Sequence, residues 1–454
     1  MSQTAKTFWV VALIVGLLVG VGIGWVAKPI PEPVGVVSQE EYDALQSQLE
    51  TTRKELEVAL VGAGGEAPIK STLTGKVQFG GLFDLTGVLS TYGENEYTAA
   101  LLAADHVNAF LKAIGAQWTI EIVPEDTQTK PDIALEKVES FAARGIKLLI
   151  GPLSSGEVRA IKGYCDANKM LAVSQSSTAP DLAIPDDYIF RFCPTDKLGQ
   201  GPAVGRILYD DGRRYVIPIT RNDAWGVGLE ESAKKRFEEL GGTFLEGIRY
   251  APEAVEFTAE ARDLADKVTS AVSKYGADKI CVLDISFEEV NPLFTAASEY
   301  DVLSTVKWFG SDGTCASDAM IKDPVVLDFA VKVEYPSTIF APTESAKWNM
   351  VRENGIEVLG REPESYSYAI YDIVWAYTLS ILKVDSTNPE TIKAVLPEVA
   401  QSFFGASGWI QLDEAGDRKA GDYVIWQIVE ATPGTYEWKI VGKFLLATDT
   451  VEWY

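Results

Sequence analysis

The sequence predicts a two-lobed α/β protein with parallel sheets, carried on an N-terminal transmembrane helix. From about residue 75 onward, short β-rich runs alternate with amphipathic helical stretches, as in parallel sheets covered by helices on both faces. Ten such strands over about 380 residues exceed one comfortable sheet, so we expect two lobes. The third observation is a long uncharged segment near the N-terminus.

That segment comprises residues 7–27, which are 21 uncharged and mainly apolar positions between Lys6 and Lys28. A helix of this length spans about 30 Å, the thickness of the hydrocarbon core of a bilayer. The positive-inside bias places residues 1–6 in the cytoplasm and the bulk of the chain outside it. A cleaved secretory signal is the alternative, and it also exports the chain.

Residues 28–75 are predicted to form an extracytoplasmic stalk. Pro29, Pro31 and Pro33 give a stiff exit from the membrane. Residues 38–60 are charged and favour a short helical spacer, and the glycine-rich residues 62–71 indicate a flexible joint. The globular domain then occupies residues 76–454.

Within that domain the strands are expected in two series. The first series comprises 77–83, 118–123, 147–150, 171–173 and 188–192, and the second comprises 214–219, 243–249, 279–285, 306–309 and 331–333. The helices are expected at 94–114, 133–144, 156–168, 226–240, 257–275 and 365–382.

Composition excludes several classes of function. The 40 Lys and Arg against 65 Asp and Glu give a net charge of −25, which would repel a nucleic acid. The one histidine, His106, lies far in sequence from the candidate ligand loops, so we interpret it as structural and expect no enzyme activity. The aromatic series at positions 366, 368, 371, 375 and 377 is interpreted as packing along one helix.

The four cysteines are Cys165, Cys193, Cys281 and Cys315, and no two of them form a C-x-x-C pair. We therefore expect neither a metal site nor a cofactor. In an exported protein they could form disulfides with three possible connectivities, of which pairing within each lobe is preferred.

Two loops that follow neighbouring strands are rich in small and hydroxyl-bearing residues. They are GPLSSG at 151–156, which opens a helix, and SQSSTAP at 174–180. Ligands of open parallel sheets bind at the carboxyl ends of the strands, and a helix N-terminus there favours an anion. Neither loop contains Lys or Arg, so a carboxylate is expected rather than a polyphosphate. The alternative is that Ser154 and Thr178 merely cap helices.

At these residues the chain resembles the type I periplasmic solute-binding proteins, specifically the leucine/isoleucine/valine-binding family of ABC importers. The resemblance runs from about residue 76 to the C-terminus. Its motifs include GGLFDLTGVL at 80–89, YGE at 92–94, IGPLSS at 150–155, STAP at 177–180, WFGSDG at 308–313, and GWI followed by LDEAGDR at 408–418. It implies two lobes joined by three crossings, with lobe I at about 76–194 and 333–412 and lobe II at about 195–332 and 413–454.

The resemblance also implies which residues hold the carboxylate of a ligand. By position, Ser155 donates its hydroxyl to the carboxylate. Thr178 and the backbone around Ser176 and Ser177 complete that side of the site.

The remaining ligand contacts implied by the resemblance are aromatic or acidic. Tyr92 matches the aromatic residue that covers the ligand from lobe I, and Trp225 stands where the family usually has a tyrosine. Asp312 matches the acid that pairs with an α-ammonium group, and Phe287 is a further candidate for the side-chain pocket. The tryptophan alters the size of the pocket, so the preferred side chain need not be that of leucine, isoleucine or valine.

The expected function is therefore extracytoplasmic binding of an amino acid, branched-chain-like or otherwise apolar or aromatic, by closure of two lobes. The implied partners are ABC permease subunits with cytoplasmic ATPases, and the membrane through residues 7–27. One alternative is a ligand-sensing ectodomain, although only about six residues would lie inside the cell. Another is a binder of an amide, urea or a small carboxylic acid.

Overall fold

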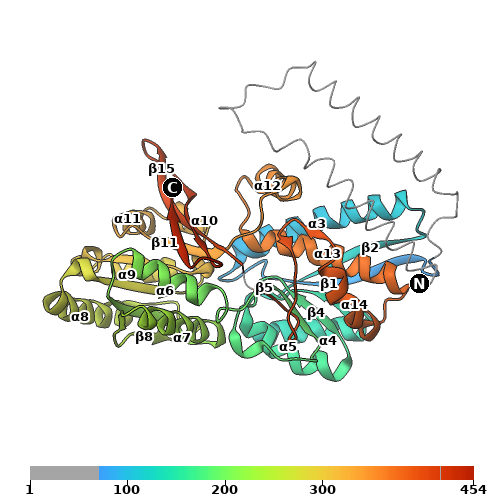
Figure 1. Ribbon diagram of the computed structural model, residues 1–454, viewed down its shortest axis with the longest axis horizontal. Coiled ribbons are helices and arrows are strands. Elements are labelled where there is room, and N and C mark those ends of the chain that lie inside the picture. Colours follow the sequence, from blue (N-terminus) through green and yellow to red (C-terminus); the bar gives the residue numbers. More distant parts are fainter. Residues whose placement is uncertain (1–70, 420) are drawn as a thin grey trace, which may run out of the picture. The chain divides into compact units, whose positions relative to one another are not determined.

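The computed structural model describes residues 71–419 and 421–454 (Figure 1). The predicted anchor at 7–27 and nearly all of the predicted stalk at 28–75 lie outside these residues. Within the described part of the chain, no helix is both long and apolar enough to cross a bilayer. Residues 76–108 and 120–454 form one compact unit, and the fold and site are described within it.

The first sheet has six strands in the order β14-β5-β4-β3-β1-β2. Its strands are β1 (Gly75–Phe83), β2 (Trp118–Asp126), β3 (Leu148–Ile150), β4 (Leu171–Ser174), β5 (Ile189–Pro194) and β14 (Asp417–Arg418). Every residue of β3, β4 and β5 is buried, as expected for parallel strands covered on both faces. The associated helices are α3 (Ser90–Ala113), α4 (Pro131–Ala143), α5 (Ser155–Asn168), α13 (Ser365–Val384) and α14 (Pro389–Ala400). In Figure 1, α13 and α14 lie on one face of this sheet and α4 and α5 on the other.

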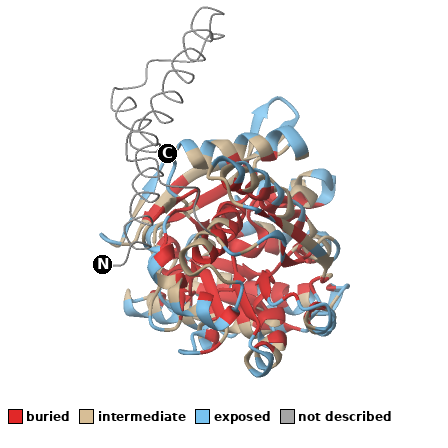
Figure 2. Cartoon of the chain, turned by 90° about the vertical axis from the view of Figure 1, so that its right-hand side faces the viewer, coloured by how far each residue is buried: buried red, intermediate tan, exposed pale blue. Residues whose placement is uncertain are grey.

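The second sheet is also parallel and follows the order β10-β9-β6-β7, with β8 paired to β6. Its strands are β6 (Tyr215–Arg221), β7 (Thr243–Phe244), β8 (Ile248–Tyr250), β9 (Ile280–Ile285) and β10 (Lys307–Phe309). The helices of this region are α6 (Gln200–Asp210), α7 (Ala224–Glu239), α8 (Thr258–Tyr275), α9 (Val290–Ala297), α10 (Asp318–Lys322) and α11 (Pro324–Lys332). Two parallel sheets confirm the two-lobed α/β prediction, and the buried strands form the interior shown in red in Figure 2.

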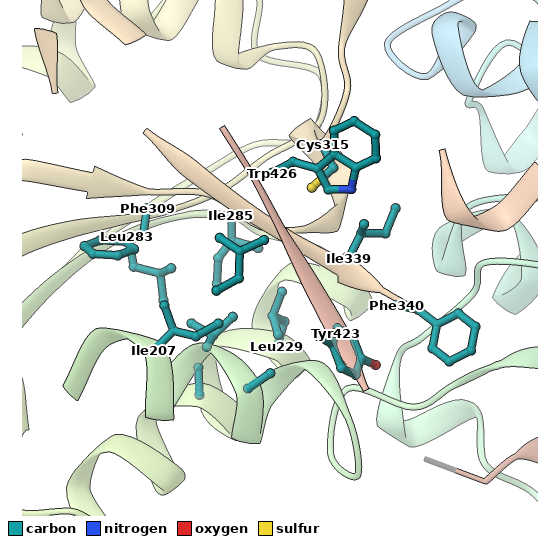
Figure 3. Packing of buried hydrophobic residues seen from close by; sticks show 14 of the residues in the cluster. Ile207, Leu229, Leu283, Ile285, Phe309, Cys315, Ile339, Phe340, Tyr423 and Trp426 are labelled. Carbon is teal, nitrogen blue, oxygen red and sulfur yellow. The ribbon is translucent and has the colours of Figure 1, made fainter. Parts of the chain in front are cut away.

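A third, antiparallel sheet was not predicted. It comprises β11 (Pro336–Phe340), β15 (Tyr423–Thr432), β16 (Thr435–Leu445) and β17 (Thr450–Trp453). Its inner residues join one hydrophobic cluster with the second sheet and with α6 and α7, and Figure 3 shows Ile339 and Trp426 from this sheet near Ile285. This sheet therefore packs on the second sheet.

The remaining elements complete the described part of the chain. They are α12 (Ala346–Leu359), the pair β12 (Phe404–Gly405) and β13 (Gly408–Trp409), and the 3-10 turns η1 (Pro180–Leu182), η2 (Ala277–Lys279), η3 (Asp301–Thr305) and η4 (Asp312–Thr314). The predicted lobe boundaries stay a prediction.

Two strand predictions were wrong. Residues 331–333 end helix α11, because Asp323 caps it, Pro324 begins it, and Val326, Phe329 and Ala330 are buried at helical spacing. The predicted strand at 243–249 divides into β7 and β8. Between them Gly247 approaches Pro218 so closely that a Cβ would lie 2.3 Å from the carbonyl oxygen of Pro218.

The preferred disulfide pairing within each lobe was also wrong, because all four cysteines are buried free thiols. Cys165 and Cys193 belong to different hydrophobic clusters. Cys281 lies at the start of β9, whereas Cys315 follows the opposite end of the neighbouring strand β10 and lies beside Trp426 in Figure 3.

Candidate functional site

The candidate site is a small cavity at the carboxyl ends of strands from both parallel sheets. Its lining residues are Leu89, Tyr92, Leu153, Ser154, Ser155, Ser176, Trp225, Phe287, Asp312, Gly313 and Tyr366. Six of the eight predicted site residues are among them. Ser177 and Thr178 are not, and the structure gives each of these two side chains another role.

The N-terminus of α5 forms one wall of the cavity. Ser154 is its N-cap, accepting a hydrogen bond from the Glu157 amide, and the Glu157 carboxylate accepts hydrogen bonds from the Ser154 amide and hydroxyl. This capping box satisfies part of the helix end and leaves the amides of the first turn near the cavity. Capping by Ser154, raised as an alternative from the sequence, is confirmed.

Ser155 is placed to donate to a ligand. Its Oγ accepts hydrogen bonds from the Ser177 hydroxyl at 3.1 Å and from the Ala179 amide at 3.2 Å. Two accepted bonds direct its own hydroxyl hydrogen away from both donors, and no acceptor for it occurs among the described residues. Ser155 therefore supplies a hydrogen-bond donor beside the positive end of a helix.

The loop after β4 adds one residue to the lining of the cavity. Ser176 lines the cavity, and its hydroxyl donates to the Leu153 carbonyl at 2.9 Å. The hydroxyl of Thr178 donates to the Asp196 carboxylate at 2.9 Å. The Thr178 hydroxyl is thus engaged by Asp196, and the Ser177 hydroxyl orients Ser155. That Thr178 and the backbone around Ser176 and Ser177 complete a carboxylate site stays a prediction.

A buried arginine fixes this loop. Arg191 on β5 has no exposed surface and forms a two-pronged ion pair with Asp417 at 2.6 and 2.5 Å. One of its terminal nitrogens also donates to the carbonyls of Ser177 and Ala179, at 3.0 and 2.7 Å. Because those carbonyls bind Arg191, the loop is held in the conformation that brings Ser177 and the Ala179 amide to Ser155.

Asp312 is the one acidic residue that lines the cavity. It is 4% exposed, and its Oδ2 accepts a hydrogen bond from the Tyr366 hydroxyl at 2.7 Å. Its Oδ1 is buried and has no hydrogen-bond partner among the described residues. Burial raises the pKa of Asp312 to about 6, and the Tyr366 hydrogen bond is the largest of the opposing interactions, which also involve Gln200 and Trp225. An unpartnered carboxylate oxygen in a cavity provides a position for a cationic group.

Tyr92 connects the two lobes across the cavity. It lies on α3 beside the first sheet, and its hydroxyl donates to the carbonyls of Asp312 and Cys315, the latter at 2.6 Å. Nearby, the hydroxyl of Thr91 donates to the Glu288 carboxylate at 2.5 Å. These hydrogen bonds link the two sides of the cavity, and the covering role of Tyr92 stays a prediction.

Two stacked rings form the opposite wall. Trp225, in the first turn of α7, and Phe287 have ring centroids 4.5 Å apart at 18°. The guanidinium group of Arg221 lies 4.6 Å from the centroid of the Phe287 ring. Gly313 passes close to both rings, since a Cβ there would lie 2.8 Å from an atom of each.

The sequence analysis missed Tyr366 as a site residue, because it was included in the aromatic packing series of α13. Its hydroxyl binds Asp312, 54 positions away in the chain, and nothing in the local sequence indicated that contact. Leu89, Leu153 and Gly313 were also missed, although all three stand within motifs of the family resemblance. His106 does not line the cavity, and its Nδ1 lies 3.0 Å from the Tyr371 hydroxyl.

A fold of two parallel sheets with a partly charged cavity at their strand ends is typical of ligand-binding proteins. The chain belongs to the family described as receptor family ligand binding region, whose model matches residues 95–431. The fold is that of the type I periplasmic binding proteins.

Known proteins similar to this chain include both uncharacterised and solute-binding proteins. An uncharacterised protein of Methanocaldococcus jannaschii is 31% identical over 395 residues, covering 83% of this chain and 91% of the relative. A Leu/Ile/Val-binding protein homolog of Brucella melitensis is 24% identical over 360 residues, covering 78% and 91%. The crystal structure of the leucine-binding protein LivK of Thermotoga maritima aligns with a TM-score of 0.66 at 20% identity, covering 80% of this chain and 97% of that one.

Proposed function

We propose that this protein is the substrate-binding component of an ABC importer and binds an amino acid by closure of its two lobes. The observation that carries the proposal is the pairing of Ser155 with Asp312 across one cavity. Ser155 offers a neutral donor at a helix N-terminus, which suits a carboxylate, and Asp312 offers an unpartnered carboxylate oxygen, which suits an ammonium group. An amino acid carries both groups.

Closure follows from the same contacts. Tyr92 and Thr91 from the side of the first sheet bind Asp312, Cys315 and Glu288 from the side of the second. A ligand held by Ser155 and Asp312 contacts both sides only when these hydrogen bonds are formed, so binding shifts the population toward the closed state. The named relative from Brucella, a Leu/Ile/Val-binding protein homolog, supports the same class of function. The chemistry is binding alone, so no enzyme activity is proposed.

The proposal includes a location and partners. The protein would be anchored by residues 7–27 in the cell membrane, with residues 28–75 as the stalk and the binding domain outside the cytoplasm. It would deliver its ligand to permease subunits driven by cytoplasmic ATPases. Permease and ATPase genes beside the gene for this protein would support the importer, whereas a neighbouring kinase gene would favour a sensing ectodomain.

A thermal-shift experiment on the full-length protein tests the binding chemistry. We expect amino acids to stabilise it, by about 2.7 kcal/mol at a concentration 100 times the dissociation constant. N-acetyl amino acids lack the ammonium group and amino-acid amides lack the carboxylate, so both should lose most of the shift. An equal shift with N-acetyl compounds or with simple carboxylic acids would refute the assignment of Asp312 and favour a different solute.

A further inference from the structure

The closed cavity is small for its class. The space in it that the centre of a water molecule can occupy is only about 20 Å³. A water needs roughly 10–15 Å³ on that measure, so the closed cavity holds one or two waters. Typical ligand pockets are larger, at about 300–1,000 Å³. Any ligand must therefore enlarge the closed cavity, and the required enlargement grows with its side chain.

The space is limited on one side by Trp225 and Phe287. The two rings are 3% and 5% exposed and stack on each other, so neither can move without losing the other's contact. Atom Cη2 of Trp225 and Cδ1 of Phe287 would each lie 2.8 Å from a Cβ on Gly313. Since Gly313 directly follows Asp312, the rings reach the backbone beside the acid proposed to hold the ammonium group. The side chain of a bound amino acid would meet these rings close to its Cα.

Arg221 contacts the Phe287 ring directly and is connected to Trp225 through Asp223. Arg221 lies over Phe287 and binds the Glu289 carboxylate at 2.7 Å and the Asp223 carboxylate at 2.6 Å. Asp223 is also the N-cap of α7, the helix that begins with Ala224 and Trp225. The capped N-terminus of α7 thus fixes the position of the Trp225 indole. The guanidinium group of Arg221 packs on the face of the Phe287 ring and fixes that ring. Rigid walls resist enlargement more than flexible ones.

We propose that this site selects amino acids with small side chains, such as glycine, alanine and serine, and that Trp225 sets the size limit. The inference rests on the proposed function, because it assumes a zwitterion held between Ser155 and Asp312. Larger apolar amino acids must displace the ring pair and lose its stacking and its contact with Arg221. They therefore bind more weakly, although they bury more apolar surface.

Calorimetric titration of the full-length protein with glycine, alanine, serine, valine, leucine and phenylalanine tests the size limit. We expect the small amino acids to bind at least tenfold more tightly than leucine and phenylalanine. In Trp225→Ala, leucine should gain at least tenfold relative to alanine, and Trp225→Phe should give a smaller change in the same direction. Trp225→Phe keeps an apolar ring at the position, so it provides a folded variant if the alanine variant unfolds, as circular dichroism would show. The control Trp409→Ala removes a tryptophan that is 57% exposed and outside the cavity, and should leave the ranking unchanged.

Two results would overturn the inference and leave the proposed function intact. One is wild-type protein that binds leucine or phenylalanine as tightly as alanine. The other is an unchanged ranking in both folded Trp225 variants. If none of the six amino acids binds, the proposed function itself fails, and the size limit fails with it.

Discussion

Asp312→Asn should stabilise the ligand-free protein at neutral pH while abolishing its response to amino acids. The carboxylate is buried and only one of its oxygens has a hydrogen-bond partner among the described residues. Asparagine has nearly the same shape, and its side-chain carbonyl can still accept the hydrogen bond from Tyr366. The substitution therefore removes the cost of burying a charge and changes little else in the ligand-free cavity.

The magnitude follows from the pKa of Asp312. Burial raises it from 3.8 to about 6, and each pKa unit corresponds to about 1.4 kcal/mol. The ionised Asp312 thus costs the folded state up to about 3 kcal/mol at pH 7.5. Since the folded state binds this proton more tightly than the unfolded state, the cost grows as pH rises from about 4 to about 6 and is absent below that range. The uncharged amide of the Asp312→Asn variant carries no such cost at any pH.

Urea unfolding of both proteins at pH 7.5 and at pH 4 measures this difference. We expect Asp312→Asn to be more stable by up to about 3 kcal/mol at pH 7.5 and the two proteins to be about equal at pH 4. Buried acids that do not interact with Asp312 titrate alike in both proteins, so their contributions cancel. The charge of Asp312 helps to raise the pKa of Asp196, so relief of that repulsion adds to the stabilisation of the variant. The exposed Asp266 on α8 supplies a matched control, and Asp266→Asn should change stability little at either pH. A variant no more stable than wild type at pH 7.5, or a difference of the same size at both pH values, would refute a buried ionised Asp312.

Two further predictions concern the carboxylate wall and the ring pair. Ser155→Ala should weaken amino-acid binding about tenfold, because it removes a hydrogen bond to a charged group. Thr178→Ala should leave affinity nearly unchanged, because the Thr178 hydroxyl binds Asp196. Calorimetry that shows equal losses of affinity in the two variants would contradict these roles. Gly313→Ala should destabilise the protein by about 1–3 kcal/mol in urea unfolding, because its Cβ would lie 2.3 Å from the Ser286 carbonyl oxygen and 2.8 Å from an atom of each ring. The control Gly163→Ala, at a helical position with nothing within 4 Å, should stabilise it by about 0.5–1 kcal/mol, and equal effects at the two glycines would contradict the packing argument.

The parallel sheets could be predicted because their strands are short runs buried on both faces and separated by helices of regular period. β9 illustrates this, with all six of its residues buried and within the predicted range 279–285. The third sheet was missed because its strands β15 and β16 are partly exposed and carry mixed polar and aromatic residues. They are strands because they pair with one another and with β11, a contact that local composition does not reveal.

The residues of the candidate site were likewise predicted only in part. Ser155 and Asp312 were predicted from the family resemblance, and both follow parallel strands, at whose carboxyl ends ligands bind. Thr178 follows a parallel strand too, but the direction of its side chain depends on the crossing segment that contains Asp196. The contact of Tyr366 with Asp312 depends on where α13 begins relative to η4, and no short-range pattern encodes that distance.

The ion pair of Arg191 with Asp417 has a consequence for the order in which the chain can fold. The two residues are 226 positions apart, and β14, which contains Asp417, is a two-residue strand at the edge of the first sheet. Before β14 has been synthesised, Arg191 lacks Asp417 as its partner. Its guanidinium group must then stay hydrated, because burying an unpaired guanidinium is strongly unfavourable. The loop at 177–179 then lacks its anchor. The wall that carries Ser155 is therefore completed only after β14 has joined the edge of the first sheet.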